Sequence, residues 1–403
     1  MFRSLAVPLA LAVLAGCAGV PGRDVAGPPA ACAPCSCPAC PGVEPPKPAA
    51  KPLEAAGWND LPGWPEEDLA PALKTFANSC EILGKRALWR DACSAARAAL
   101  AGSLAGPALR NWFESRFSPW QLVNPDGSRE GLITGYYEPV LRGSRVRHPP
   151  YINPLYRVPD DLLTIDLAEI YPELKGLRLR GRLAGNRVLP YPARDEIARE
   201  EDVRAAQALV WIDDAVELFF IQIQGSGQVD LDDGQRIRVG FADQNGHPYR
   251  SVGKWLADHG ELKLEQTSMQ GIKTWAGANP QRMQQMLNAN PSVVFFREVP
   301  LSGSGPPGAM GVALTPERSI AVDAKTTPLG APVWLATTQP GSEQALFRLT
   351  FAQDTGGAIR GPVRADFYWG SGSAAGEQAG RMRQRGRMWI LLPLGQKPDQ
   401  ALR

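Results

Sequence analysis

Two aspartates near the C-terminal end of the chain flank a stretch rich in glycine. In the sequence QDTGGAIRGPVRADFYWGSG, Asp354 and Asp366 bracket glycines and a proline, and three aromatic residues follow Asp366. Asp is unfavourable inside helices and strands, whereas Gly allows positive φ or the close approach of a ligand. The stretch predicts either a turn-rich loop with solvated carboxylates or a polar site built on a tight β-loop.

Further segments combine turn residues with polar or aromatic side chains. They are TGYYEP, FFIQIQGSGQVDLDDG and AVDAKTTPLG, the last of which contains Asp323. Tyr and Trp offer an apolar face with a polar edge, and amide or hydroxyl groups bind sugar hydroxyls without adding charge. Such a set is typical of a site for a sugar chain, although strand tyrosines usually pack in the core and strand glutamines are usually solvated. The candidate contact residues are Thr134, Tyr136, Gln222, Gln224, Gly225 and Ser226, with Gln222 and Gln224 expected on one face of a strand.

The composition excludes several other functions. The 403 residues include 43 Lys and Arg against 41 Asp and Glu, so the net charge of +2 gives no strongly basic surface for binding nucleic acid. The three histidines are not spaced as metal ligands, and no nucleotide-binding loop is present. We therefore expect no cofactor and no metal in the catalytic part.

The N-terminal segment predicts a targeting signal rather than a folded domain. MFRSLAVPLALAVLAGC has one Arg, then an apolar run too short to span a bilayer comfortably, and ends at Cys17. It resembles a bacterial lipoprotein signal over residues 1–16, with Cys17 as the site of lipid attachment; a generic secretory signal is the alternative. Ala18 after the cysteine favours an outer membrane lipoprotein that faces the periplasm and is held to the membrane by its lipid anchor.

Residues 17–57 are rich in Pro, Ala and Cys and predict a flexible tether. Four of its cysteines, Cys32, Cys35, Cys37 and Cys40, could hold a metal. Disulfides, within the tether or between chains, are the expected outcome in an oxidising compartment.

A helical hairpin is expected between residues 65 and 104. Apolar residues recur there at spacings of three and four, before and after Gly84. Cys80 and Cys93 both lie on these apolar stripes, which predicts a buried disulfide across the hairpin, with two buried free thiols as the alternative.

From about residue 131 to 393, β-type runs dominate. Many of them alternate apolar and polar residues and end at Gly, Pro or Asp. Helices are expected only in SVGKWLADHGEL and NPQRMQQMLNAN within this region. The fold class predicted is mainly β, with closed barrels rather than a doubly wound sheet.

Five motifs resemble those of the MltA family of membrane-bound lytic murein transglycosylases. They are TGYYEP, IQGSG, NPSVVFFRE, VDAKTTPLG and AQDTGGAIRGPVRADFYWG, in family order from about Leu132 to Leu392. Val293 departs from the pattern, which has an aromatic residue there. The resemblance implies a double-psi β-barrel interrupted by an inserted β-barrel. It divides the chain into residues 58–138, which hold the helical part and the first piece of the barrel, an insert at 139–299, and a three-aspartate domain at 300–396.

The resemblance also implies a reaction. Such an enzyme cleaves the β-1,4 bond between N-acetylmuramic acid and N-acetylglucosamine in peptidoglycan and leaves a 1,6-anhydromuramic acid end, for cell wall turnover. Asp366 would serve as the single acid and then base, while Asp354 and Asp323 would raise its pKa or organise the loops. The alternatives are a non-catalytic peptidoglycan-binding lipoprotein and a hydrolytic muramidase that uses Glu138 or Asp354. Proteins of wall synthesis or division are further candidate partners.

Overall fold

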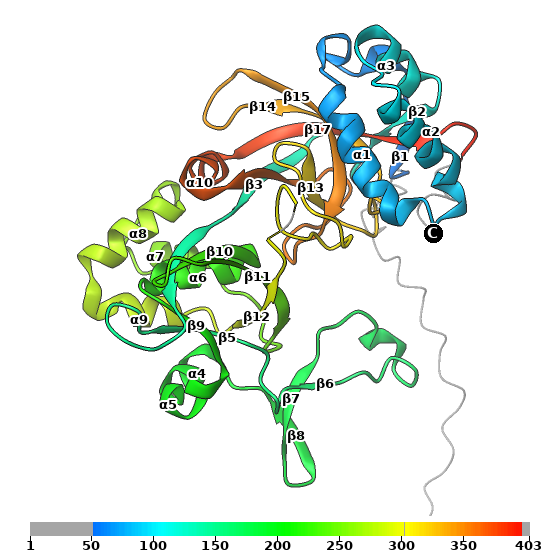
Figure 1. Cartoon of the computed structure of the whole chain (residues 1–403). Coiled ribbons are helices and arrows are strands. Elements are labelled where there is room, and N and C mark those ends of the chain that lie inside the picture. The colour runs from blue at the N-terminus through cyan, green and yellow to red at the C-terminus, as the bar shows by residue number, and fades with distance from the viewer. Residues whose placement is uncertain (1–50, 302, 397–403) are drawn as a thin grey trace, which may run out of the picture. The chain divides into compact units, whose positions relative to one another are not determined.

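The computed structural model describes residues 51–301 and 303–396 (Figure 1). The predictions for the signal, for Cys17 and for the four tether cysteines lie outside these residues. Within the described part, no helix has both the length and the apolar character needed to cross a membrane.

A six-stranded barrel is built from segments far apart in the sequence. The strand order in its sheet is β1-β2-β17-β14-β15-β13-β16-β3, and β3 also pairs with β17, which closes a ring of six strands. Two pairings, β13 with β15 and β16 with β3, are parallel. The strands are β1 Leu53–Ala55, β2 Phe117–Leu122, β3 Gly131–Glu138, β13 Ser319–Val322, β14 Pro332–Thr338, β15 Ala345–Asp354, β16 Ala365–Ser371 and β17 Arg383–Pro393.

The segment between β3 and β13 forms a second sheet. Its order is β12-β11-β10-β4-β9-β5, and a single parallel bridge between Arg157 and Phe296 joins the two edges. Its strands are β4 Val140–Ser144, β5 Asn153–Tyr156, β9 Ala208–Ile212, β10 Ser226–Leu231, β11 Arg236–Gln244 and β12 Val294–Val299. A small third sheet consists of β6 Leu163–Thr164, β7 Arg180–Ala184 and β8 Arg187–Pro190.

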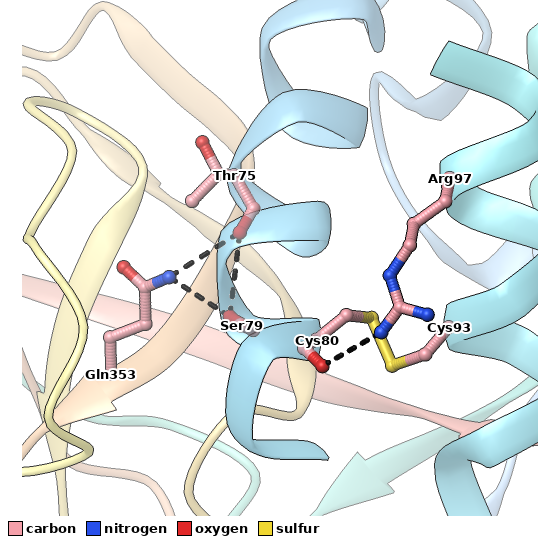
Figure 2. Close-up of a disulfide and its surroundings, with 6 residues drawn as sticks. All are labelled: Thr75, Ser79, Cys80, Cys93, Arg97 and Gln353. Carbon is pink, nitrogen blue, oxygen red and sulfur yellow. Dashed lines mark hydrogen bonds between the residues drawn. A yellow bond between two sulfur atoms is a disulfide. The ribbon is translucent and has the colours of Figure 1, made fainter. Parts of the chain in front are cut away.

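The expected helical hairpin packs on the barrel. Helix α1 (Ala70–Leu83) and helix α2 (Arg90–Ala101) are joined by a disulfide between Cys80 and Cys93 (Figure 2). Helix α3 (Gly106–Glu114) follows. Phe76 of α1 stacks on Phe351 of β15, with ring centroids 6.0 Å apart. The hairpin therefore shares one hydrophobic core with the barrel.

The prediction of a mainly β fold was wrong in its helical content, because the fold mixes helices and sheets. The remaining helices are α4 Arg194–Arg199, α5 Glu201–Arg204, α6 Ala215–Gln224, α7 Val252–Asp258, α8 Met269–Ala278, α9 Pro280–Asn288 and α10 Gly372–Arg381. The two helices predicted in this region, α7 and α9, are present.

The predicted strand containing Gln222 and Gln224 is helix α6. Asp214 caps its first turn by accepting hydrogen bonds from the N–H groups of Val216 and Glu217, and Gly225 ends it with φ of 78°. A side chain that caps a helix start and a left-handed glycine at its end outweigh the alternation of the sequence between them.

Two further observations correct details of the sequence analysis. Strand β1 lies inside residues 17–57 and pairs with β2, so the last part of the predicted tether belongs to the barrel sheet. Val293, which replaces an expected aromatic residue, is buried in a cluster with Tyr191 and Phe295 beside the second sheet. Its side chain contributes to a core rather than to a surface groove.

Candidate active site

Asp354 and Asp366 face the same small residue of the strand between them. In the register of the barrel, Ala321 of β13 pairs with Asp354 of β15 on one side and with Asp366 of β16 on the other. Paired residues in a sheet project to the same face, and strands two apart are separated by about 10 Å. Ala321 is itself buried, in a cluster with Tyr136 and Tyr368, and the two carboxylates therefore project to the same face of the sheet as its methyl group.

A β-bulge directs Asp354 to this face. Ile320 pairs with Ala352 and Ala321 with Asp354, so Gln353 is the extra residue of β15. Its side chain is fully buried and donates hydrogen bonds to Ser79 Oγ over 2.9 Å and to the Thr75 carbonyl over 3.4 Å on α1 (Figure 2). A bulge re-aims the side chains that follow it. Helix α1 therefore holds the residue that sets the direction of Asp354.

Asp366 is held by the neighbouring strand. The Thr134 hydroxyl donates a hydrogen bond to Asp366 Oδ1 over 2.6 Å, because Thr134 on β3 is the register partner of Asp366. Burial raises the pKa of Asp366 to about 6, and the charge of Asp354 adds to the rise. The Thr134 hydrogen bond and the Arg364 guanidinium oppose it. Asp366 is thus protonated in mildly acidic solution.

Asp354 is fixed by three donors. The N–H groups of Ala309 and Thr355 donate to Oδ1 over 2.8 and 2.9 Å, and the Tyr136 hydroxyl donates to Oδ2 over 3.0 Å. Burial raises the pKa of Asp354, and these hydrogen bonds counteract the rise. Burial together with the charge of Asp354 raises the pKa of Tyr136 well above its usual value, so Tyr136 remains a donor.

Asp323 has a different role in the geometry. It lies in the turn after β13, where Oδ1 accepts from the Lys325 N–H over 3.1 Å and Oδ2 accepts from the Gly361 N–H over 2.9 Å. These contacts join its own turn to the loop between the other two aspartates. Of the two roles considered from the sequence, the organisation of the loops is the one that its contacts match.

Comparison with known proteins decides the family. Residues 132–297 match the MltA specific insert domain and residues 318–392 match the 3D domain. Membrane-bound lytic murein transglycosylase A of Escherichia coli K12 is 33% identical over 294 residues, which cover 71% of this chain and 72% of the relative. The chain belongs to the MltA family.

Solved structures agree with this membership. MltA from Neisseria gonorrhoeae is 39% identical, with a TM-score of 0.73, and the match covers 88% of this chain and 99% of that one. Escherichia coli MltA with bound chitohexaose is 28% identical, with a TM-score of 0.65 and coverages of 86% and 96%. The chain is thus a lytic murein transglycosylase with the MltA fold and a 3D domain.

In this MltA-family chain, Glu138 is not an available second carboxylate. Its side chain is fully buried and forms an ion pair with Arg238, whose Nε lies 2.7 Å from Oε1. A carboxylate held in this way has no room for an attacking water. The structure therefore removes Glu138 as the water-activating base of the hydrolytic alternative.

The predicted contact residues separate into three groups. Thr134 and Tyr136 bind the two carboxylates directly. Gln224 lines a cavity of about 200 Å³, together with Gly135 and Tyr137, and its Oε1 accepts from the Tyr137 N–H over 3.4 Å. Because side chains alternate along a strand, this cavity lies across β3 from Thr134 and Tyr136.

The other predicted contact residues serve the second sheet. Gln222 Oε1 accepts from Arg194 Nη2 over 2.7 Å, and Arg194 also stacks on Phe219. Gly225 ends α6, and Ser226 begins β10 opposite Gly240. Gln222, Gly225 and Ser226 therefore contact the second sheet and its helix rather than the two carboxylates.

Arg364 is the residue that sequence reasoning missed. Its Nη1 donates to the carbonyl groups of Leu132 and Ala365, over 3.3 and 2.5 Å, and its charge lowers the pKa of Asp366. The signal was available, because residues 364 and 366 alternate onto one face of an extended segment. Across the described ranges 51–301 and 303–396, there is no group of three or more His, Cys, Asp or Glu placed to hold a metal ion.

Proposed function

We propose that this chain cleaves the β-1,4 bond between N-acetylmuramic acid and N-acetylglucosamine of peptidoglycan and leaves a 1,6-anhydromuramic acid end. The observation that carries the proposal is the environment of Asp366. Its carboxyl group has a pKa raised to about 6 by burial, which suits a group that must first donate a proton and then accept one.

In the first step, protonated Asp366 donates its proton to the glycosidic oxygen, and the bond from that oxygen to C1 of muramic acid breaks. Positive charge develops at C1. In the second step, the Asp366 carboxylate takes the proton of the 6-hydroxyl of the same muramic acid while that oxygen bonds to C1. Atoms and charge balance without water, and Asp366 returns to its protonated form.

Asp354 supports the charge changes at Asp366. Three donors hold its carboxylate on the same face of the sheet, where its charge favours the protonated form of Asp366. The same charge would attract the positive charge that develops at C1. A hydrolase of the usual kind needs a second carboxylate that acts as nucleophile or activates water. Asp354 is anchored at both oxygens, which favours an electrostatic role.

The glycan strands of peptidoglycan are the proposed partner. The structure of Escherichia coli MltA with chitohexaose supports a sugar chain as the ligand. We further propose that the six-stranded barrel is of the double-psi type, since its parallel pairs β13–β15 and β16–β3 bring non-consecutive strands together. The nearly closed second sheet is then the inserted barrel.

The arrangement of the chain in the cell is part of the proposal. The proposed domain bounds are 58–138, 139–299 and 300–396, with β1 added to the first part by its pairing with β2. The passage of the chain between the two sheets at Pro139 and Pro300 supports the two internal bounds. The name of the relatives describes them as membrane-bound. We propose an outer membrane lipoprotein, anchored at Cys17 and facing the periplasm, that takes part in cell wall turnover.

The direct test is digestion of peptidoglycan sacculi by the purified chain and by Asp366→Asn. Mass spectrometry of the released muropeptides should show products one water lighter than hydrolytic products, and the variant should lose them. Reducing ends would reject the proposed reaction. Tight binding of both proteins without release would indicate a glycan-binding lipoprotein instead.

A further inference from the structure

A buried ion pair lies where the chain leaves the barrel. Glu138 is the last residue of β3, and the second sheet begins two residues later at Val140. Glu138 Oε1 accepts from Arg238 Nε over 2.7 Å, and Oε2 accepts from Arg238 Nη2 over 3.3 Å. Both side chains are buried, with 4% of Arg238 and none of Glu138 exposed.

The groups around Glu138 come from both sheets. Gln228 Nε2 of β10 donates to Glu138 Oε2 over 2.8 Å, and the Ser371 hydroxyl at the end of β16 donates to the same oxygen over 2.9 Å. We call Glu138, Gln228, Arg238 and Ser371 the junction cluster. One carboxylate thus holds β3 and β16 of the barrel to β10 and β11 of the second sheet.

The junction cluster also holds the segment by which the chain returns. Arg238 Nη1 donates to the Pro300 carbonyl over 3.4 Å, and the N–H of Gln228 donates to the Pro139 carbonyl over 2.8 Å. Pro139 and Pro300 follow the strands at the two crossings between the sheets. The junction cluster therefore holds both connecting segments, one through Arg238 and the other through Gln228.

The same strands carry the site. Thr134 lies four residues before Glu138 on β3, and Asp366 lies five residues before Ser371 on β16. On the other side, β10 follows α6, which carries Gln224 at the cavity beside β3. A change at the junction cluster would therefore move the second sheet relative to Thr134 and Asp366.

Stability alone does not explain such a pair. Desolvation of two charges offsets most of their attraction, and well-packed apolar residues of similar volume often replace a buried pair without loss of stability. An Arg fork on a carboxylate does, however, fix direction through several hydrogen bonds. This geometry is what an apolar pair would not reproduce.

We propose that Glu138 and Arg238 are positioning residues that fix the second sheet against the barrel, so that a glycan strand meets Asp366 in productive register. The inference rests on the proposed function, because it assigns the pair a part in binding the same glycan. Its central claim concerns the geometry between the two sheets, which can also be measured without substrate.

The test compares the variant E138M/R238M with the matched control E67M/R318M in the full chain. Glu67 and Arg318 form another buried ion pair, each with 6% of its side chain exposed, away from the junction cluster. Soluble peptidoglycan chains serve as substrate, and Tm, kcat and KM are measured. We expect the junction variant to keep its Tm within the range of the control, while its KM rises on the order of tenfold to a hundredfold.

Spin labels provide the readout that is independent of activity. Labels are attached through keto amino acids at Glu343, in the turn between β14 and β15 of the barrel sheet, and at Val203 of α5, beside the second sheet. Both positions are exposed, and the pair of labels reports one distance distribution. We expect a narrow distribution in the wild type and in the control, and a broadened one in E138M/R238M. Ser371→Ala, which removes one hydrogen bond only, should give a smaller change in the same direction.

Each outcome decides the inference. Unchanged KM and unchanged label distances in E138M/R238M would overturn it, as would an equal change in the control. If E138M/R238M fails to fold, Ser371→Ala with unaltered distances and KM would overturn it. A wild type that releases no anhydro product rejects the proposed function, and the label distances still decide the positioning role.

Discussion

Asp354 and Asp366 lie in register with one residue, Ala321, on the strand between them. This arrangement follows from the barrel, because β13 has β15 on one side and β16 on the other. Two carboxylates on one face raise each other's cost of ionisation. Burial is the main cause of the raised pKa of Asp366, and the charge of Asp354 adds to the rise.

Asp354→Asn should shift the pH dependence of kcat/KM to lower pH. The charge of Asp354 raises the pKa of Asp366, so its removal lowers that pKa. The acid is required in its protonated form, and the rate falls as pH rises through the pKa. The falling limb of the pH profile therefore moves to lower pH, and activity at neutral pH decreases. A limb in its original place, measured on peptidoglycan from pH 4 to 9, would show that Asp354 does not act on Asp366.

Thr134→Val should move the falling limb of the kcat/KM profile to higher pH. The Thr134 hydroxyl lowers the pKa of Asp366 by donating to its ionised form over 2.6 Å, so its loss raises the pKa. The maximum rate should also fall by about tenfold, because the carboxyl loses its orientation. Thr134→Ser retains the hydroxyl and is the matched control. A Val variant whose profile superimposes on that of the Ser variant would argue against this hydrogen bond.

Asp323→Ala should lower the thermal stability and leave the falling limb of the kcat/KM profile at the same pH. The carboxylate accepts from the backbone of Lys325 and Gly361, and hydrogen bonds to a charged group contribute about 2 kcal/mol. Thermal unfolding measures the loss, and Asp323→Asn, which keeps one acceptor, should lose less. Full thermal stability combined with abolished activity would assign Asp323 to the chemistry instead.

Loss of the disulfide should destabilise the hairpin that supports Asp354. Cys80 and Cys93 are 13 residues apart, and closing a loop of that length contributes about 3 kcal/mol. Ser79, next to Cys80, binds Gln353 (Figure 2). C80A/C93A should unfold at a lower temperature than the wild type. Reductant should lower the Tm of the wild type to that of the variant and leave the Tm of the variant unchanged. An equal Tm for the oxidised wild type and the variant would contradict this prediction.

The sequence was informative where chemistry depends on short motifs. The segment from Gln353 to Gly372 contains both carboxylates, and the motif TGYYEP contains Thr134 and Tyr136, which bind them. The apolar stripes carrying Cys80 and Cys93 predicted the hairpin and its disulfide. In each case the pattern that carries the prediction lies within one short motif or along one regular element.

Contacts between residues far apart in the chain could not be predicted from the sequence. The sequence alone allows Glu138 as a base, because its ion-pair partner Arg238 lies 100 residues away in the chain. The bulge at Gln353 depends on the register of β13 and on the polar groups of α1. Helix α6 was misread because a short apolar run with alternating residues fits a strand or a buried helix equally well.

The most direct measurement of the central claim is digestion of sacculi in water labelled with the heavy oxygen isotope. If the 6-hydroxyl of muramic acid captures C1 with Asp366 as its base, the new ends are anhydro and carry none of the label. Asp366→Asn should decrease the amount of released product by at least about a hundredfold. Muramic acid ends that incorporate labelled oxygen from the solvent would contradict the account, because water would then be the nucleophile.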